Sequence, residues 1–133
     1  ITPFNFPLNL VAHKVAPCLA TGNAMLLKPA LKTPLSALLL AEVLEAAGVP
    51  AGQIQTIPFH HDLVPGLIDD VRVRMVSFTG SAGVGWQLKR EAAKKKVALE
   101  LGGNAAVVVE PDADWQDAIP RIASGAFGYA GQS

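Results

Sequence analysis

Glu100 is the residue whose type and surroundings most directly suggest chemistry. It lies in an apolar, strand-like run of residues 97–101, and two glycines, Gly102 and Gly103, follow at once. Burial raises the pKa of a carboxyl group, and a raised pKa suits a general base that activates water near neutral pH. The alternative is a strand-end carboxylate that turns into solvent, which this segment alone slightly favours.

A glycine-rich segment, residues 78–85, joins a predicted strand to a predicted helix. Backbone N–H groups and the helix dipole at such a turn can face a phosphate. The glycine spacing is G-x-x-G-x-G and therefore differs from the dinucleotide fingerprint G-x-G-x-x-G. An ordinary tight turn is the alternative for this segment.

Two polar side chains stand next to prolines. Lys28 ends a short strand just before Pro29, and ligands of open parallel sheets bind at this end of the strands. A solvated lysine is the alternative there. Asn5 lies between Pro3 and Pro7, and a rigidly held amide can donate to a developing oxyanion, although it could also cap a helix.

The composition narrows the function classes. The 133 residues carry eleven basic and eleven acidic side chains, so nothing suggests binding to nucleic acid or to an anionic membrane. Hydrophobic residues make up 50% of the chain, yet no apolar run approaches the ~20 residues of a membrane span. We expect the apolar excess to face protein, either other parts of a longer polypeptide or other subunits.

The ends and the cysteine content add two expectations. The chain starts at Ile1 and stops at Ser133 within a pattern, which indicates an internal piece of a longer polypeptide. The single cysteine, Cys18, excludes an internal disulfide and favours a reducing, cytoplasmic compartment. Cys18 lies in a predicted buried helix, where we interpret it as structural.

Strand-like and helix-like segments alternate, which predicts βαβ units and a parallel sheet. Thr33 is the expected N-cap of the second helix, with Pro34 at its first position. The expected strands are residues 24–28, 54–57, 71–78, 97–101 and 105–109. The expected helices are residues 8–19, residue 34 to a stop at Gly48, and residues 63–69, 85–93 and 115–127.

Five motifs in the same order and spacing resemble the aldehyde dehydrogenase superfamily, and the resemblance covers essentially the whole chain. The motifs are residues 2–7 (TPFNFP), 22–34 with GN, KP and TP, 78–81 (FTGS), 100–104 (ELGGN) and 131–133 (GQS). The resemblance implies an α/β fold with an open, mostly parallel, Rossmann-like sheet flanked by helices. Residues 1–101 would be part of the nucleotide-binding domain, and residues 102–133 would begin a second α/β catalytic domain.

The resemblance also implies roles for individual residues. Asn5 matches the asparagine that stabilises the thiohemiacetal oxyanion, and Glu100 matches the general base for hydrolysis of the thioester. Lys28 matches the lysine that holds the adenosine ribose, and Gly80 with Ser81 matches the turn at the pyrophosphate. The further cofactor-binding positions implied are Thr2, Pro3, Phe4, Pro29, Ala30, Leu31, Val84, Leu101 and Gly102.

The expected reaction is the oxidation of an aldehyde to a carboxylic acid with NAD or NADP through a cysteine thioester. Relatives that transfer the acyl group to coenzyme A tend to lack the glutamate, so Glu100 favours hydrolysis. Many NAD-preferring relatives carry a glutamate where this chain has Leu31. Since that carboxylate would repel a 2′-phosphate, Leu31 predicts that the complete enzyme accepts NADP.

The family's cysteine nucleophile directly follows a Gly-Gln-x segment, so the chain is expected to stop one residue short of it. A non-catalytic NAD(P)-binding module or a structural remnant without the nucleophile is therefore the alternative for the chain alone. For the complete protein we expect a small-molecule aldehyde substrate and a homo-oligomer, with no nucleic acid and no membrane partner.

His60, His61 and Asp62 resemble a metal cluster in composition. Adjacent histidines point apart on most backbones, and no further ligand set is visible. The sequence therefore predicts a solvated loop and no metal site.

Overall fold

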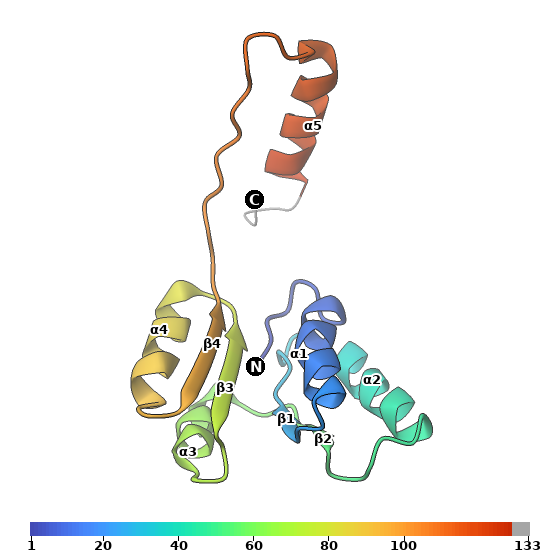
Figure 1. Ribbon diagram of the computed structural model, residues 1–133, viewed down its shortest axis with the longest axis vertical. Coiled ribbons are helices and arrows are strands. Elements are labelled where there is room, and N and C mark those ends of the chain that lie inside the picture. The colour runs from blue at the N-terminus through green and yellow to red at the C-terminus, as the bar shows by residue number, and fades with distance from the viewer. Residues whose placement is uncertain (129–133) are drawn as a thin grey trace. The chain divides into compact units, whose positions relative to one another are not determined.

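The computed structural model describes residues 1–128, which divide into two compact units, Ile1–Gly102 and a second that begins at Gly103. Helices and strands alternate in the first unit, as Figure 1 shows. They are α1 (Asn9–Ala20), β1 (Met25–Leu27), α2 (Leu35–Ala46), β2 (Ile54–Thr56), the 3-10 turn η1 (His61–Leu63), α3 (Val64–Asp69), β3 (Met75–Thr79), α4 (Ala82–Glu91) and β4 (Lys96–Glu100). The second unit contains α5 (Trp115–Phe127).

The first two residues join two parallel strand pairs into one sheet. β1 pairs in parallel with β2, and β3 pairs in parallel with β4. Between these pairs the N–H of Thr2 donates to the carbonyl of Lys28 at 3.1 Å, and the carbonyl of Ile1 accepts from the N–H of Thr79 at 3.2 Å. The order across the sheet is therefore β2, β1, Ile1–Thr2, β3, β4, which confirms the predicted parallel α/β architecture.

Two apolar clusters hold the helices to this sheet. One lies between α1, α2 and β1, and the other lies between α3, α4, β3 and β4 (Figure 1). The first contains Val11, Val15, Leu27 and Ala37. The second contains Val64, Ile68, Val76, Phe78, Leu88 and Ala92. The helices α1, α2, α3 and α4 thus each bury apolar side chains against the strands. The polar candidate residues lie at the ends of the strands.

The expected cap of the second helix is wrong. α2 begins after Pro34, which occupies the N-cap position with a helical backbone, and no side chain caps the helix. The hydroxyl of Thr33 instead donates to the carbonyl of Phe4 at 3.2 Å. Thr33 therefore ties the loop after β1 to the segment that holds Asn5, a long-range contact that a local capping pattern does not reveal.

The third expected strand starts later than predicted. Residues 71–72 form a turn and residues 73–74 have no regular structure, because the Asp70 carboxylate accepts from both the backbone and the side chain of Arg72. The Arg72 guanidinium holds the pKa of the Asp70 carboxyl well below its usual range. This local polar network competes with strand pairing, although the alternation of apolar and charged residues suggested a strand.

The fifth expected strand, residues 105–109, is not formed in the described part of the chain, where these residues have no regular structure. Val107 and Val108 are exposed. β-branched residues favour a strand only when a neighbouring strand completes the hydrogen bonds, and residues 1–128 supply no such neighbour here.

The last expected helix is confirmed as α5, whose start is capped by the Asp114 carboxylate accepting from Gln116 and Asp117 N–H groups. Among the described residues, no helix has both the length and the apolar character needed to cross a bilayer.

Candidate active site

Backbone hydrogen bonds place the candidate residues along one edge of the sheet. Thr2 bonds to Lys28, and the residue before it, Ile1, bonds to Thr79. The N–H of Gly80 then donates to the carbonyl of Glu100 at 3.0 Å. Lys28, Thr2, Gly80 and Glu100 thus follow neighbouring strands in one row, where open α/β sheets bind their ligands.

Lys28 is a buried cation. Only 8% of its surface is exposed, and burial lowers the pKa of its ammonium group. Its Nζ lies 5.4 Å from the centroid of the Phe59 ring, within range of a cation–π contact. No carboxylate among residues 1–128 forms an ion pair with it. The alternative of a solvated strand-end lysine is therefore wrong, and the ammonium retains donor capacity for a ligand hydroxyl or phosphate.

Thr2, whose N–H donates to the carbonyl of Lys28, carries a second buried polar group. The residue is 4% exposed, and its Oγ1 has no hydrogen-bond partner among the described residues. A buried hydroxyl without a partner is costly, so its presence at a strand end indicates a place for a polar ligand. The Thr2 hydroxyl and the Lys28 ammonium both suit the hydroxyl-rich ribose of a dinucleotide.

The glycine-rich turn forms the next part of the edge. A Cβ at Gly80 would lie 2.5 Å from Cζ of the buried Phe78 ring, so only glycine fits where the chain passes over this ring. Ser81 follows with an extended backbone at the N-cap of α4, and its side chain makes no capping hydrogen bond. The first N–H groups of α4 lack intrahelical partners by geometry and can face an anion such as a pyrophosphate.

Asn5 belongs to an exposed segment that is tied to the loop after β1. Besides the hydrogen bond from Thr33 to the Phe4 carbonyl, the Lys32 ammonium lies 5.4 Å from the centroid of the Phe4 ring. The same loop carries Ala30 and the exposed Leu31 directly after Lys28 and Pro29. The structure thus brings the segment of Asn5 close to the loop of Leu31.

Glu100 is exposed at the end of β4, as expected for the alternative in which its carboxylate turns into solvent. Val97 and Leu99 pack against the cluster under α3 and α4, so alternation along the strand directs Ala98 and Glu100 to the opposite face. The chain thus exposes Glu100 on the face of the sheet opposite α3 and α4.

Lys14 is a residue that the sequence-based interpretation missed. This side chain from α1 is half-buried, and its Nζ donates to Oγ of Ser77 on β3 at 3.0 Å. Burial lowers the pKa of Lys14, and the negative charge of Glu100 acts in the opposite direction. The sequence did contain a signal for Lys14. This charged residue lies between Val11 and Val15 on the apolar side of the predicted helix, where a charge is not expected.

The remaining positions that the resemblance implied lie around α4. Val84 is exposed on α4. The Leu101 side chain packs against α4 at Gly85, where an added Cβ would lie 2.3 Å from Cδ2 of Leu101. Leu101 and Gly102 line a shallow hollow together with Glu100 and Trp86. The motif of residues 131–133 lies outside the described residues.

Cys18 has the contacts of a structural cysteine. Its thiol donates to the carbonyl of Asn23 at 3.3 Å, and burial raises the pKa of the thiol. Both effects disfavour the thiolate that a nucleophile requires.

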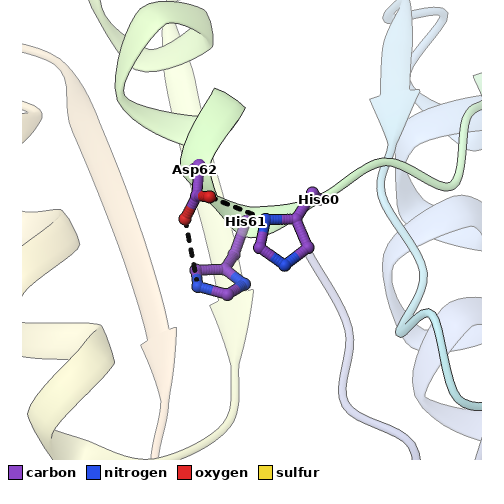
Figure 2. A group of neighbouring side chains, drawn as sticks. All are labelled: His60, His61 and Asp62. Carbon is purple, nitrogen blue, oxygen red and sulfur yellow. Dashed lines mark hydrogen bonds and ion pairs between the residues drawn. The ribbon is translucent and has the colours of Figure 1, made fainter.

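The expectation that the side chains of His60 and His61 point apart is wrong, whereas all three residues of this cluster are exposed, as expected of a solvated loop. Figure 2 shows that the two imidazoles turn toward the same carboxylate. His60 Nδ1 lies 2.9 Å from Asp62 Oδ2, and His61 Nε2 lies 3.2 Å from Asp62 Oδ1. The extended backbone at His60 and the 3-10 turn that follows bring consecutive side chains to one side.

Comparison with known proteins identifies the family. The model of the aldehyde dehydrogenase family matches residues 1–133. The NADP(+) succinate-semialdehyde dehydrogenase GabD of Escherichia coli is 46% identical over 136 residues, covering 100% of this chain and 28% of GabD. The chain spans 26–30% of the length of the curated relatives it matches.

Two solved structures share the fold at high similarity. Glyceraldehyde-3-phosphate dehydrogenase GapN of Methanocaldococcus jannaschii, complexed with NADP, superposes with a TM-score of 0.88 and 41% identity, over 98% of this chain and 30% of GapN. A variant of aldehyde dehydrogenase C of Pseudomonas syringae, complexed with NAD+ and octanal, has a TM-score of 0.93 and 37% identity, over 99% of this chain and 28% of that chain. The chain therefore belongs to the aldehyde dehydrogenase family.

Proposed function

We propose that the complete protein containing this chain oxidises an aldehyde to a carboxylic acid with NAD or NADP. The observation that carries the proposal is the hydrogen-bonded row Lys28–Thr2, Ile1–Thr79 and Gly80–Glu100 at one edge of the sheet. This row holds the residues that would bind the dinucleotide and activate water, and the chain's membership of the aldehyde dehydrogenase family supports these roles. The cofactor, when bound, supplies the hydride acceptor.

The residues at this edge fit a dinucleotide. The buried Lys28 ammonium and the unpartnered Thr2 hydroxyl would bind ribose hydroxyl groups. Gly80 and Ser81 would bring backbone N–H groups of the turn and of α4 to the pyrophosphate. Because residue 31 is a leucine and not a carboxylate, we propose that the complete enzyme accepts NADP. GabD is named as an NADP(+) enzyme, and the GapN structure contains NADP.

Asn5 and Glu100 would perform the two steps that the chain's own residues contribute. The Asn5 amide would donate to the oxyanion that forms when a thiolate adds to the aldehyde carbonyl. Glu100 would take a proton from the water that hydrolyses the resulting thioester. Glu100 is exposed in the structure of residues 1–128, which leaves space beside its carboxylate for water and for a substrate.

Glu100→Gln in the complete enzyme tests this assignment, because the amide keeps the shape of the side chain and loses the base. We expect the initial burst of reduced cofactor to remain while steady turnover falls by about 10²- to 10⁴-fold. Stopped-flow absorbance of the reduced cofactor measures both phases. Glu110→Gln, an exposed acid beyond the sheet, is the matched control and should turn over normally. An unchanged steady rate in Glu100→Gln would remove Glu100 from the mechanism.

The alternative function for the 133-residue chain alone is a cofactor-binding module without turnover. The specific observation in its favour is that Cys18 is the single cysteine of the sequence and has the contacts of a structural residue.

For the complete protein we propose a homo-oligomer, since large apolar side chains such as Leu35, Leu39 and Val43 form an exposed stripe along α2.

A further inference from the structure

His60, His61 and Asp62 place three metal-binding groups at one point of the surface. One ligand atom from each residue lies within 4.8 Å of the other two, and each imidazole contacts a different oxygen of the same carboxylate (Figure 2). From these contacts we propose that the three side chains bind one divalent transition-metal ion. The proposal is independent of the proposed oxidation, because none of the three belongs to the edge that holds Lys28 and Glu100.

The distances are close to those around a bound ion. Metal–nitrogen and metal–oxygen bonds of about 2.1 Å in a tetrahedral site put neighbouring ligand atoms roughly 3.4 Å apart. The two imidazole–carboxylate separations are 2.9 Å and 3.2 Å. Because the ligand atoms already lie within 4.8 Å of one another, rotations of these exposed side chains would bring both nitrogens and a carboxylate oxygen to bonding distance from one ion.

The donor set selects the kind of ion. Two imidazole nitrogens and one carboxylate oxygen favour Ni²⁺, Zn²⁺, Co²⁺ or Cu²⁺ over Mg²⁺ and Ca²⁺, which prefer oxygen ligands. Asp62 supplies a negative charge between the two rings and so compensates part of the charge of the ion. Water would complete the coordination, because all three side chains are exposed.

The backbone holds the three residues in position before an ion arrives. Phe59, on one side, packs against the apolar cluster under α3 and α4, and Val64, on the other side, is buried in it. Between them the N–H of Leu63 donates to the carbonyl of His60 at 3.2 Å and closes the 3-10 turn. A segment anchored at both ends loses less conformational entropy on binding than a free loop.

Calorimetric titration of the metal-free 133-residue chain with Ni²⁺ at pH 7.5 tests the proposal. Ni²⁺ is chosen because it is less attracted to the Cys18 thiol than Zn²⁺. We expect one ion per chain, and we expect His61→Ala and Asp62→Asn each to weaken binding at least tenfold. His13→Ala is the matched control, because His13 is the remaining histidine of the sequence and is exposed on α1.

The pH dependence gives a second readout. A metal ion and a proton compete for the same imidazole nitrogen, so the apparent affinity for Ni²⁺ should fall at least tenfold between about pH 7.5 and pH 5.5. Far-UV circular dichroism checks that the exposed substitutions leave the fold intact, and His61→Gln repeats the test with a side chain of similar size. The proposal is overturned if the chain binds no Ni²⁺, if His61→Ala or Asp62→Asn binds as tightly as the parent chain, or if His13→Ala loses the same affinity.

Discussion

Lys28 illustrates how the burial of one charge points to a ligand. An ammonium group removed from water without a carboxylate partner is unfavourable, and a cation–π contact with Phe59 offsets only part of that cost. The neighbouring Thr2 hydroxyl is also buried without a partner among residues 1–128. A backbone hydrogen bond joins the two residues, so these buried polar groups support the proposal of a polar ligand at this end of the sheet.

Leu31 is the residue at which cofactor preference can be tested. We expect Leu31→Glu in the complete enzyme to weaken NADP binding roughly tenfold or more relative to NAD, because the new carboxylate would repel a 2′-phosphate and accept from ribose hydroxyl groups. Michaelis constants for both cofactors measure the ratio. Val71→Glu, at an exposed valine in the turn after α3, controls for the added charge. An unaltered NADP-to-NAD ratio in Leu31→Glu would show that this loop does not contact the 2′-position.

At the scale of elements, α4 depends on two glycines with different surroundings. Gly85 is buried where the helix crosses Leu101, whereas a Cβ at Gly83 would meet nothing within 4 Å. The close approach at Gly85 lets the helix lie directly on the strand end that follows Glu100. The glycine-rich segment is therefore both a turn and a helix–sheet contact.

Gly85→Ala and Gly83→Ala should change stability in opposite directions. The first forces the Leu101 side chain aside and should cost about 1–3 kcal/mol. The second should stabilise the chain by up to about 1 kcal/mol, since alanine loses less backbone entropy than glycine in a helix. Urea unfolding of the two variants beside the parent chain measures both effects. Equal changes in the two variants would mean that Leu101 does not pack on α4 as described.

At the scale of the whole molecule, the chain combines the row from Lys28 to Glu100 with a single cysteine, Cys18, whose thiol is hydrogen-bonded and has a raised pKa. We expect the 133-residue chain to bind NAD and NADP in calorimetric titrations and to oxidise no aldehyde. Lys28→Met should weaken binding at least tenfold through loss of the buried donor. Lys94→Met removes an exposed ammonium away from this row and is the matched control. Equal effects of the two substitutions would contradict the place given to Lys28, and turnover by the chain alone would contradict the binding-module alternative.

The order of helices and strands, the parallel sheet and the family follow from the sequence by itself, because apolar periodicity and the spacing of motifs are local properties of the chain. α5 was predicted at the bounds that the structure has. Local patterns failed where distant segments compete, as in the turn at Asp70 and in residues 105–109, which find no strand partner among residues 1–128.

Only the tertiary structure decided how the candidate residues meet. The hydroxyl of Thr33 contacts Phe4 instead of capping α2, and Lys14 crosses from α1 to Ser77. The row from Lys28 to Glu100 depends on hydrogen bonds between residues far apart in the chain. Such contacts form because folding satisfies buried backbone groups wherever strands meet, and no spacing along the sequence encodes that pairing directly. Residue types thus supplied the candidate chemistry, while the sheet determined which of those residues share one edge.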